Sequence, residues 1–495
     1  MLYESTRDKN SRLTSMDAIK QGISKEGGLF VPEAFPRLGT EDLSDLAAGD
    51  YTMRARHILK LFLSDYKEED IDRCIEAAYV NGAFPPGVAP VVSLCPGLDV
   101  LELWHGPTCA FKDMALQLLP HLMTTAIRAT GEQKEIVILT ATSGDTGKAA
   151  LEGFRDVEGT RIIVFYPVHG VSSMQRLQMI TQKGRNTKVI AVEGNFDDAQ
   201  SGVKSIFGSD LDDRLDKAGY RLSSANSINW GRLVPQIVYY FSAYLDLINQ
   251  GRIKKWQTVN VVVPTGNFGN ILAAYYAKRM GLPLGRLICA SNRNNVLTDF
   301  ISTGVYDINR IFYKTTSPSM DILISSNLER LLYELSERDT DFVSGLMREL
   351  KERGRYKVDG QLLNRLNDLF WGSYADEGQT RATIKDTFEK YGYTLDPHTA
   401  VGKFVYDQYR LQTGDTTETI LVSTASPFKF PAEVLKALGY EGDVPDEAAC
   451  LEDLSRVTGV PVPAPLESLS HSEVLHKDVC SREGMKQALL SYLKL

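Results

Sequence analysis

A short turn at residues 266–270 has the composition of an anion-binding site. An apolar run, TVNVVVPTG at 258–266, leads into the sequence GNFGN, and a helical pattern follows it. Gly266 and Gly269 allow backbone N–H groups to approach an anion closely, and the helix presents the positive end of its dipole there. The turn therefore predicts a phosphate cup, although a glycine-containing turn without a ligand has the same pattern.

A lysine stands where a loop gives way to an apolar helical pattern. Lys112 lies in ELWHGPTCAFKDMALQLL, and its flanks include Phe111, Met114 and Leu118. Apolar surroundings desolvate an amine, lower its pKa and favour imine formation with a carbonyl. A lysine at a helix start is otherwise a solvated surface residue, so the neighbouring motifs must decide between the two interpretations.

Two more turns between a strand and a helix carry small polar residues, SGDTG at 143–147 and STA at 423–425. The first is not a nucleotide-binding P-loop, because Thr142 stands where that motif needs Gly and Ala149 where it needs Ser or Thr. Its hydroxyls and backbone N–H groups still suit a carboxylate.

Composition excludes several classes of function. The chain has 495 residues, 24% of them charged, with a net charge of -8, which argues against a nucleic-acid partner. Its six cysteines form no C-x-x-C pair and there is no H-E-x-x-H, so we expect no metal. The charged N-terminus and the absence of an apolar run of membrane-spanning length lead us to expect a cytoplasmic protein with no membrane partner.

The elements that must position these turns are strands and helices in alternation. Short runs rich in Val and Ile are separated by segments of helical length; these runs are IVILTAT, RIIVFYP, KVIAVEG, TVNVVVPTG, RLICAS and TILVSTA. Strands that are apolar on both faces predict an α/β fold with parallel sheets covered by helices on both sides. Ligands bind such sheets beyond the carboxyl ends of the strands, where the three turns stand.

The chain divides into three predicted regions. Residues up to about 80 are mostly helical in pattern, and FPPGVAPVV at 84–92 is typical of a linker. A polar, helix-rich stretch at about 303–393 has the character of an insertion, and VPVPAP precedes a helical tail. The predicted regions are an N-terminal one at 1–95, a smaller α/β domain at 96–235, and a larger α/β domain with the insertion and the tail at 236–495.

Together the motifs resemble the threonine synthase family of fold-type II pyridoxal-phosphate enzymes. HGPTCAFKD, SGDTG, GNFGN and STASP occur in the order of that family. SKEGGLFVPE at 24–33 and DPHTAVG at 396–402 resemble the longer microbial and fungal branch, so the similarity extends from about residue 4 to residue 440. It departs at Ser426, where many relatives have a histidine. The resemblance implies two doubly wound, mainly parallel sheet domains beside a helical N-terminal region.

The resemblance also implies the cofactor, pyridoxal 5′-phosphate, and assigns roles. Lys112 would hold the cofactor as an imine and move protons, and Thr424 would hydrogen-bond the pyridine nitrogen. The loop for the cofactor phosphate would consist of Gly266, Asn267, Phe268, Gly269 and Asn270. The loop for the α-carboxylate of the substrate would consist of Ser143, Gly144, Asp145 and Thr146.

The implied reaction converts O-phospho-L-homoserine and water to L-threonine and phosphate. SANSINWGR, at 224–232, offers Asn226 and Arg232 for the phosphate of the substrate, because a guanidinium fork matches a phosphate. Arg232 could instead be an ordinary arginine at the start of a helix.

Two other functions remain open, a phospholyase or a serine/threonine dehydratase on the same scaffold, and a non-catalytic binding protein. The sequence leaves the choice between a monomer and a homodimer open.

Overall fold

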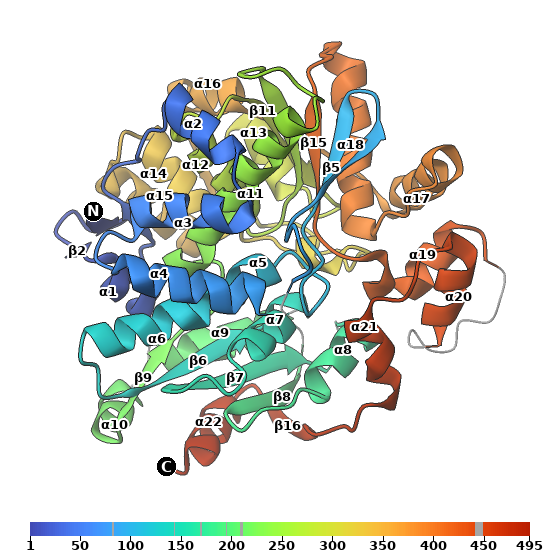
Figure 1. The fold of residues 1–495 in the computed structure, drawn as a ribbon. Coiled ribbons are helices and arrows are strands. Elements are labelled where there is room, and N and C mark those ends of the chain that lie inside the picture. The colour runs from blue at the N-terminus through green and yellow to red at the C-terminus, as the bar shows by residue number, and fades with distance from the viewer. Residues whose placement is uncertain (82–83, 143, 169–170, 195, 208–210, 441–448) are drawn as a thin grey trace.

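The computed structural model describes residues 1–495 except 82–83, 143, 169–170, 195, 208–210 and 441–448. Two sheets, each packed between helices, lie one above the other in Figure 1. This architecture confirms the predicted α/β class with two mainly parallel sheets. No helix in the part of the chain that the structure describes combines the length and the apolar character needed to cross a bilayer.

The larger sheet has six strands in the order β14-β11-β10-β15-β5-β4. Its members are β14 (Phe370–Tyr374), β11 (Leu284–Ser291), β10 (Val259–Pro264), β15 (Thr419–Ser423), β5 (Leu98–Glu102) and β4 (Val91–Cys95). All neighbours pair in parallel except β4 with β5. Alternate residues of β10 face opposite sides: Val261 packs with helices α11 (Trp230–Asn249) and α12 (Gly269–Arg279), and Val262 with α18 (Pro397–Thr413).

The smaller sheet has five parallel strands in the order β16-β8-β7-β6-β9. They are β16 (Asp478–Ser481), β8 (Thr187–Glu193), β7 (Thr160–Pro167), β6 (Glu135–Ala141) and β9 (Tyr220–Ser223). On one face Ile136 and Ile138 join the core with α6 (Leu119–Ala129) and α7 (Asp145–Gly153). On the other face Val137 and Leu139 pack with α9 (Phe196–Phe207) and α22 (Met485–Leu493).

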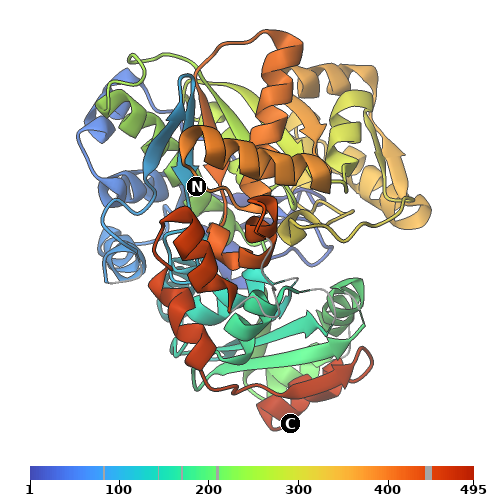
Figure 2. The same ribbon diagram turned by 90° about the vertical axis from the view of Figure 1, so that its right-hand side faces the viewer.

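The two sheets do not follow the domain ranges that we predicted. β5 lies in the range expected for the smaller domain but pairs with β15 of the larger sheet. β16, at the far end of the chain, pairs with β8 of the smaller sheet. Figure 2 shows the red C-terminal segment running from the larger sheet to the edge of the smaller one.

The N-terminal region is helical only in part. Its first strands, β1 (Tyr3–Ser5), β2 (Arg12–Leu13) and β3 (Phe30–Pro32), form a small antiparallel sheet, which the mostly helical prediction missed. Helices α1 (Ser15–Gln21), α2 (Thr40–Ala47), α3 (Tyr51–Phe62) and α4 (Glu68–Ile75) account for most of the rest. Tyr3 packs on Trp230 at the start of α11, with ring centroids 5.3 Å apart.

The insertion contributes helices, the two short paired strands β12 (Val305–Asp307) and β13 (Arg355–Lys357), and one strand of the larger sheet. Its helices are α14 (Leu328–Leu335), α15 (Thr340–Arg353), α16 (Gly360–Leu369) and α17 (Glu377–Tyr391). Asp339 and Asp376 cap the N-termini of α15 and α17, whose ends are Gly354 and Gly392 in the left-handed conformation, as capping preferences require. Between α16 and α17 the chain extends into β14, which completes the larger sheet.

Candidate active site

A cavity of about 1520 Å³ opens at the carboxyl ends of β6, β10 and β15. This is the location that open parallel sheets favour for ligands. Predicted site residues that line it are Lys112, Asp145, Thr146, Asn226, Arg232, Gly266, Asn267, Phe268, Gly269, Asn270 and Thr424. Gly144 directly precedes two of them, and Ser143 lies outside the described residues. The fold thus brings together side chains that are far apart in the sequence.

The loop that carries Lys112 is fixed to the segment after β15. Ala110 forms a β-bridge with Ala425, and the Phe111 N–H donates to the Thr424 carbonyl over 2.8 Å. Lys112 is only 8% exposed, and its Nζ lies 3.3 Å from Asp145 Oδ2. Burial lowers the pKa of Lys112 although Asp145 acts in the opposite direction. A desolvated amine of this kind is suited to nucleophilic attack on a carbonyl.

The turn before α12 has the geometry of an anion cup. Phe268 adopts a left-handed backbone with φ 63°, which is costly for a non-glycine residue and typical of ligand-binding turns. A Cβ on Gly266 would come within 2.7 Å of the Ser319 carbonyl, so only glycine fits there. The Tyr239 hydroxyl, 2.6 Å away, and the Tyr240 hydroxyl, 2.5 Å away, both donate to Asn270 Oδ1.

Asn270 provides a test of whether the turn fits a phosphate. With its oxygen held by two tyrosines, its Nδ2 is buried and has no hydrogen-bond partner in the described part of the chain. A buried donor without an acceptor costs free energy unless a ligand completes it. An anion in the cup supplies that acceptor.

Pyridoxal phosphate needs, besides a phosphate site, a hydrogen-bond partner for its ring nitrogen, and Thr424 can be that partner. Its side chain lines the cavity, and its hydroxyl makes no hydrogen bond to any residue that the structure describes. It is free to donate to a ring nitrogen beside the lysine loop. The residues present therefore fit pyridoxal phosphate, with Lys112, the cup and Thr424 around it.

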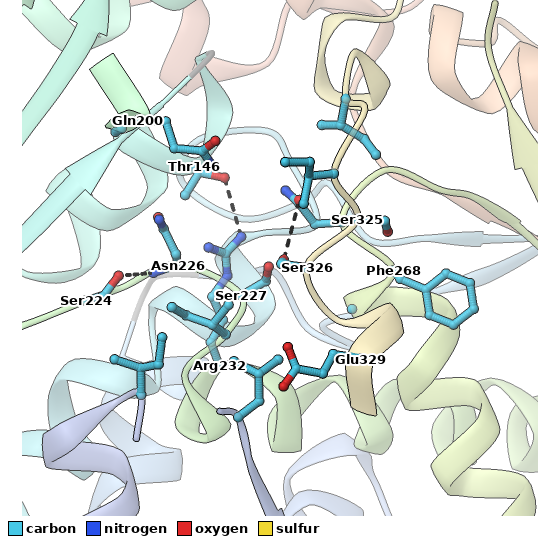
Figure 3. A pocket seen from close by; sticks show the side chains of 18 of the residues that line it. Thr146, Gln200, Ser224, Asn226, Ser227, Arg232, Phe268, Ser325, Ser326 and Glu329 are labelled. Carbon is cyan, nitrogen blue, oxygen red and sulfur yellow. Dashed lines mark hydrogen bonds between the residues drawn. The ribbon is translucent and has the colours of Figure 1, made fainter. Parts of the chain in front are cut away.

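Arg232 forms a second potential anion site, shown in Figure 3 with Thr146, Asn226 and Ser227 around it. The guanidinium is buried, and it donates to the Ala225 carbonyl over 2.8 Å and to Thr146 Oγ1 over 3.4 Å. Burial lowers its pKa to about 10. It has no ion-pair partner among the carboxylates of the described residues, which is unusual for a buried cation. Arg232 does stand in the first turn of α11, but its burial contradicts an ordinary exposed arginine there.

In the loop at the start of α7, the Asp145 side chain does not have the role predicted from the sequence. Gly144 has φ 138°, and a Cβ there would meet Gln175 at 2.4 Å, so glycine is required. The Asp145 carboxylate accepts from Lys429 Nζ at 2.7 Å and from Gln175 Nε2 at 2.9 Å. A carboxylate repels another carboxylate, so only the backbone of Asp145 and its neighbours can serve the α-carboxylate of a substrate.

Three residues near the Lys112 amine were not among the predicted site residues. Ser319 Oγ lies 3.3 Å from Lys112 Nζ and donates to Asp145 Oδ2 over 2.9 Å. His398 Nε2 accepts from the Ser319 N–H over 3.1 Å, and Lys429 is the partner of Asp145. His398 and Lys429 stand inside the motifs DPHTAVG and STASPFKF, but neither motif indicates which other segment these side chains contact.

Comparisons with known proteins show which family the chain resembles. Family models for the threonine synthase N terminus, pyridoxal-phosphate dependent enzymes and the threonine synthase C-terminal region match residues 2–79, 100–424 and 399–467. Threonine synthase of Pseudomonas aeruginosa is 41% identical over 92% of this chain and 93% of its own length. A crystal structure of pyridoxal-phosphate-bound threonine synthase from Brucella melitensis is 37% identical, covers 100% of this chain and 99% of its own, and has a TM-score of 0.87.

Another relative is longer than this chain. Human threonine synthase-like 1 is 40% identical over 97% of this chain, which spans only 66% of that protein. The matches to the three family models and to full-length relatives nevertheless cover almost all of the sequence. The chain therefore belongs to the threonine synthase family of pyridoxal-phosphate-dependent enzymes.

Proposed function

We propose that this protein converts O-phospho-L-homoserine and water to L-threonine and phosphate. The observation that carries the proposal is the pairing of two anion sites in one cavity. The cup at Gly266–Asn270 suits the cofactor phosphate, and Arg232 is a buried cation that lacks a carboxylate partner. A substrate with a γ-phosphate would neutralise Arg232 through charge-assisted hydrogen bonds.

Each group of the substrate has a matching part of the cavity. Arg232, Thr146 and Asn226 would bind the phosphate, and the backbone N–H groups at the start of α7 would bind the α-carboxylate. These contacts orient the α- and β-carbons toward the Lys112 amine, which has a lowered pKa and can accept and return protons. Bound pyridoxal phosphate supplies the electron sink that makes these carbon-bound protons acidic.

The roles of the cofactor-side residues are part of the same proposal. Lys112 would hold the cofactor, Asn267 and Asn270 would bind its phosphate, and Thr424 would donate to the pyridine nitrogen. A hydroxyl partner leaves that nitrogen largely unprotonated, unlike a carboxylate.

A phospholyase is the second candidate. This chain is about equally similar to human threonine synthase-like 1, at 40% identity, and to threonine synthase of P. aeruginosa, at 41%. The name of the human protein describes it as similar to threonine synthase and does not state that activity. A phospholyase would begin with the same proton transfers but release ammonia and a 2-oxo acid instead of adding water at the β-carbon. The site residues that the structure describes suit both outcomes, so product analysis must separate them.

The deciding experiment is to incubate the holoenzyme with O-phospho-L-homoserine and measure threonine, 2-oxobutanoate and phosphate. Equal amounts of threonine and phosphate support the proposal, and equal amounts of 2-oxobutanoate and phosphate support the phospholyase. Lys112→Ala is the matched control, because it keeps both anion sites but removes the amine. It should lose the visible absorption of lysine-bound cofactor and nearly all phosphate release.

We further propose a cytoplasmic location, based on the similarity of the chain to threonine synthases, and a monomeric or homodimeric protein. Sedimentation would distinguish the two assembly states.

A further inference from the structure

Lys429 is an unusual lysine, because it is completely buried and does not line the cavity. It is the last residue of the short helical turn η3 (Pro427–Lys429), directly after the Thr424 segment. Its Nζ lies 2.7 Å from Asp145 Oδ1 and 3.0 Å from the Thr108 carbonyl. Lysines are almost never fully buried without a partner, so the contact with Asp145 is the main electrostatic compensation for this burial.

The two oxygens of Asp145 have separate partners. Oδ1 accepts from Lys429 and Gln175. Oδ2 accepts from Ser319 Oγ at 2.9 Å and faces Lys112 Nζ at 3.3 Å. The contacts to Lys429 and Ser319 thus fix the rotation of the carboxylate and point one oxygen at the reactive amine.

Ser319 is held in place from the larger sheet. Its backbone N–H donates to His398 Nε2, and His398 Nδ1 lies 2.8 Å from Asp396 at the start of α18. His398 must carry its proton on Nδ1 to make both contacts. Asp145, on the helix that follows β6 of the smaller sheet, is therefore held by Lys429, which follows β15 of the larger sheet, and by Ser319, which contacts α18.

We propose that Lys429 is a positioning residue for the reaction: it holds Asp145 ionised and aimed at Lys112, and Asp145 stabilises the proton that Lys112 removes from the substrate. In that step the C–H bond breaks, the proton joins the lone pair of the amine, and the electron pair remains on the substrate carbon next to the bound cofactor. The resulting ammonium faces Asp145 Oδ2. This inference rests on the proposed function, because it assigns a task within that reaction.

The electrostatics of the pair support this role. Burial alone would raise the pKa of Asp145, but Lys429 and then Lys112 hold it well below the usual range. Without Lys429, desolvation would dominate and the pKa of Asp145 would rise. A protonated Asp145 could no longer stabilise a positive charge on Lys112.

Other titratable groups surround the same place. Among the described residues, the charged and titratable side chains that face Asp145 or its lysine partners include Lys112, Lys429, Lys148, His398, Arg232, Cys109 and Asp113. Burial raises the pKa of Cys109 to about 12 and that of Asp113 to about 6. Asp113 therefore titrates in the range of interest, and its pKa would rise further without Lys429. That change is common to Lys429→Met and to the double variant below, so the difference between these two variants isolates Asp145.

The first test is kinetic and uses Lys429→Met, which keeps the length of the side chain and removes its charge. We expect kcat to fall about 100-fold, the loss typical of a catalytic group displaced by about 1 Å. The acidic limb of the kcat profile should move to higher pH, and KM should change little, because Lys429 does not line the cavity. Lys403→Met is the matched control: Lys403 is 8% exposed, pairs with Asp407 and lies outside the cavity.

The second test measures thermal stability against pH without substrate. In the wild type the folded pKa of Asp145 is depressed, so its contribution to stability is fully present above its unfolded pKa. In Lys429→Met the folded pKa lies above the unfolded one, so stability is lost as the pH rises through it. The difference in Tm between wild type and variant should therefore widen as the pH rises above the unfolded pKa of an aspartate, which is about 3.9.

A double variant keeps the inference testable if Lys429→Met fails to fold. Lys429→Met with Asp145→Asn removes both buried charges, so its Tm should fall less with rising pH than that of Lys429→Met, and it should fold where the single variant does not. Its kcat should remain low, because Lys112 has lost its carboxylate.

Two results would overturn the inference: a wild-type kcat and pH profile in Lys429→Met, or a wild-type kcat in the double variant. A pH-independent Tm difference for Lys429→Met would do the same, since it indicates a packing role alone. A wild-type protein that makes no threonine would instead refute the proposed function, and the stability test would still decide whether Lys429 controls the ionisation of Asp145.

Discussion

At the scale of single residues, the site consists of groups whose hydrogen bonds are incomplete without ligands. Asn270 Nδ2 is buried without a partner in the described chain, and Arg232 is a buried cation without a carboxylate. Both conditions cost free energy in the absence of an anion. We therefore propose separate sites for two phosphates in the cavity, one near each of these residues.

Mutations can distinguish the proposed site of the cofactor phosphate from the proposed site of the substrate phosphate. Asn270→Leu should weaken cofactor binding at least tenfold, because it replaces the buried amide donor with an apolar group. Arg232→Ala should raise KM for O-phospho-L-homoserine by about tenfold to 100-fold, which corresponds to the loss of charge-assisted hydrogen bonds. Cofactor titration followed by visible absorption, together with steady-state kinetics, checks both. Loss of cofactor from Arg232→Ala with an unchanged KM would reverse the assignment.

At the scale of elements, the turns at the carboxyl ends of the strands could be located from the sequence, whereas several strands could not. The predicted runs correspond to β6, β7, β8, β10, β11 and β15 because Val and Ile fill both faces of a buried parallel strand. β5 was missed because it carries Asp99, a buried carboxylate whose pKa burial raises to about 6. β16 was missed because it is short and mostly exposed.

The same distinction applies to the site. The turn at 266–270 and Lys112 could be identified from local sequence. The spacing of the two glycines indicates the turn, and the apolar residues next to Lys112 indicate a desolvated amine. The contact of Asp145 with Ser319 and Lys429 could not be identified in this way, because these residues are more than 100 positions apart and meet only when the two sheets pack. Long-range pairing of polar side chains leaves no periodic pattern in the sequence.

The turn at the start of α7 gives a prediction about an element. Gly144→Ala places a Cβ in a backbone with φ 138° and within 2.4 Å of Gln175, so the turn must shift. We expect KM for the substrate to rise at least tenfold, because we propose that the N–H groups of this turn bind its carboxylate. Gly159→Ala is the control: φ is 73° there, and open space surrounds the new Cβ. It should lower stability by about 1 kcal/mol and leave KM unchanged. An unaltered KM in Gly144→Ala would remove this turn from the substrate site.

At the scale of the whole molecule, the C-terminal tail ties the two sheets together. It leaves the larger sheet after β15, crosses to the smaller sheet as β16, and ends in α22 (Figure 2). Leu489 of α22 is fully buried against that sheet in the core that contains Val137 and Leu139. The smaller sheet therefore depends on residues more than 250 positions away in the chain.

Shortening the side chain of Leu489, which packs α22 on the smaller sheet, should destabilise the protein without altering the chemistry of the site. Leu489→Ala should cost about 2–5 kcal/mol, because it leaves a cavity in a packed core. Leu411→Ala, at a position 80% exposed on α18, should change stability by less than about 0.5 kcal/mol. Thermal unfolding measures both, and kcat at a temperature where both variants are folded should equal that of the wild type. Equal stability of the two variants would contradict the role of the tail.

The central claim is that this cavity cleaves the bond between the γ-carbon and oxygen of a phosphorylated amino acid and adds water at the β-carbon. The most direct measurement is the reaction with O-phospho-L-homoserine in water enriched in oxygen-18, with products analysed by mass spectrometry. We expect threonine with one heavy oxygen in its hydroxyl group and phosphate without the label, because the phosphate leaves with its original oxygen atoms. Homoserine with labelled phosphate would instead reveal hydrolysis at phosphorus, and that result, or 2-oxobutanoate in place of threonine, would contradict the account.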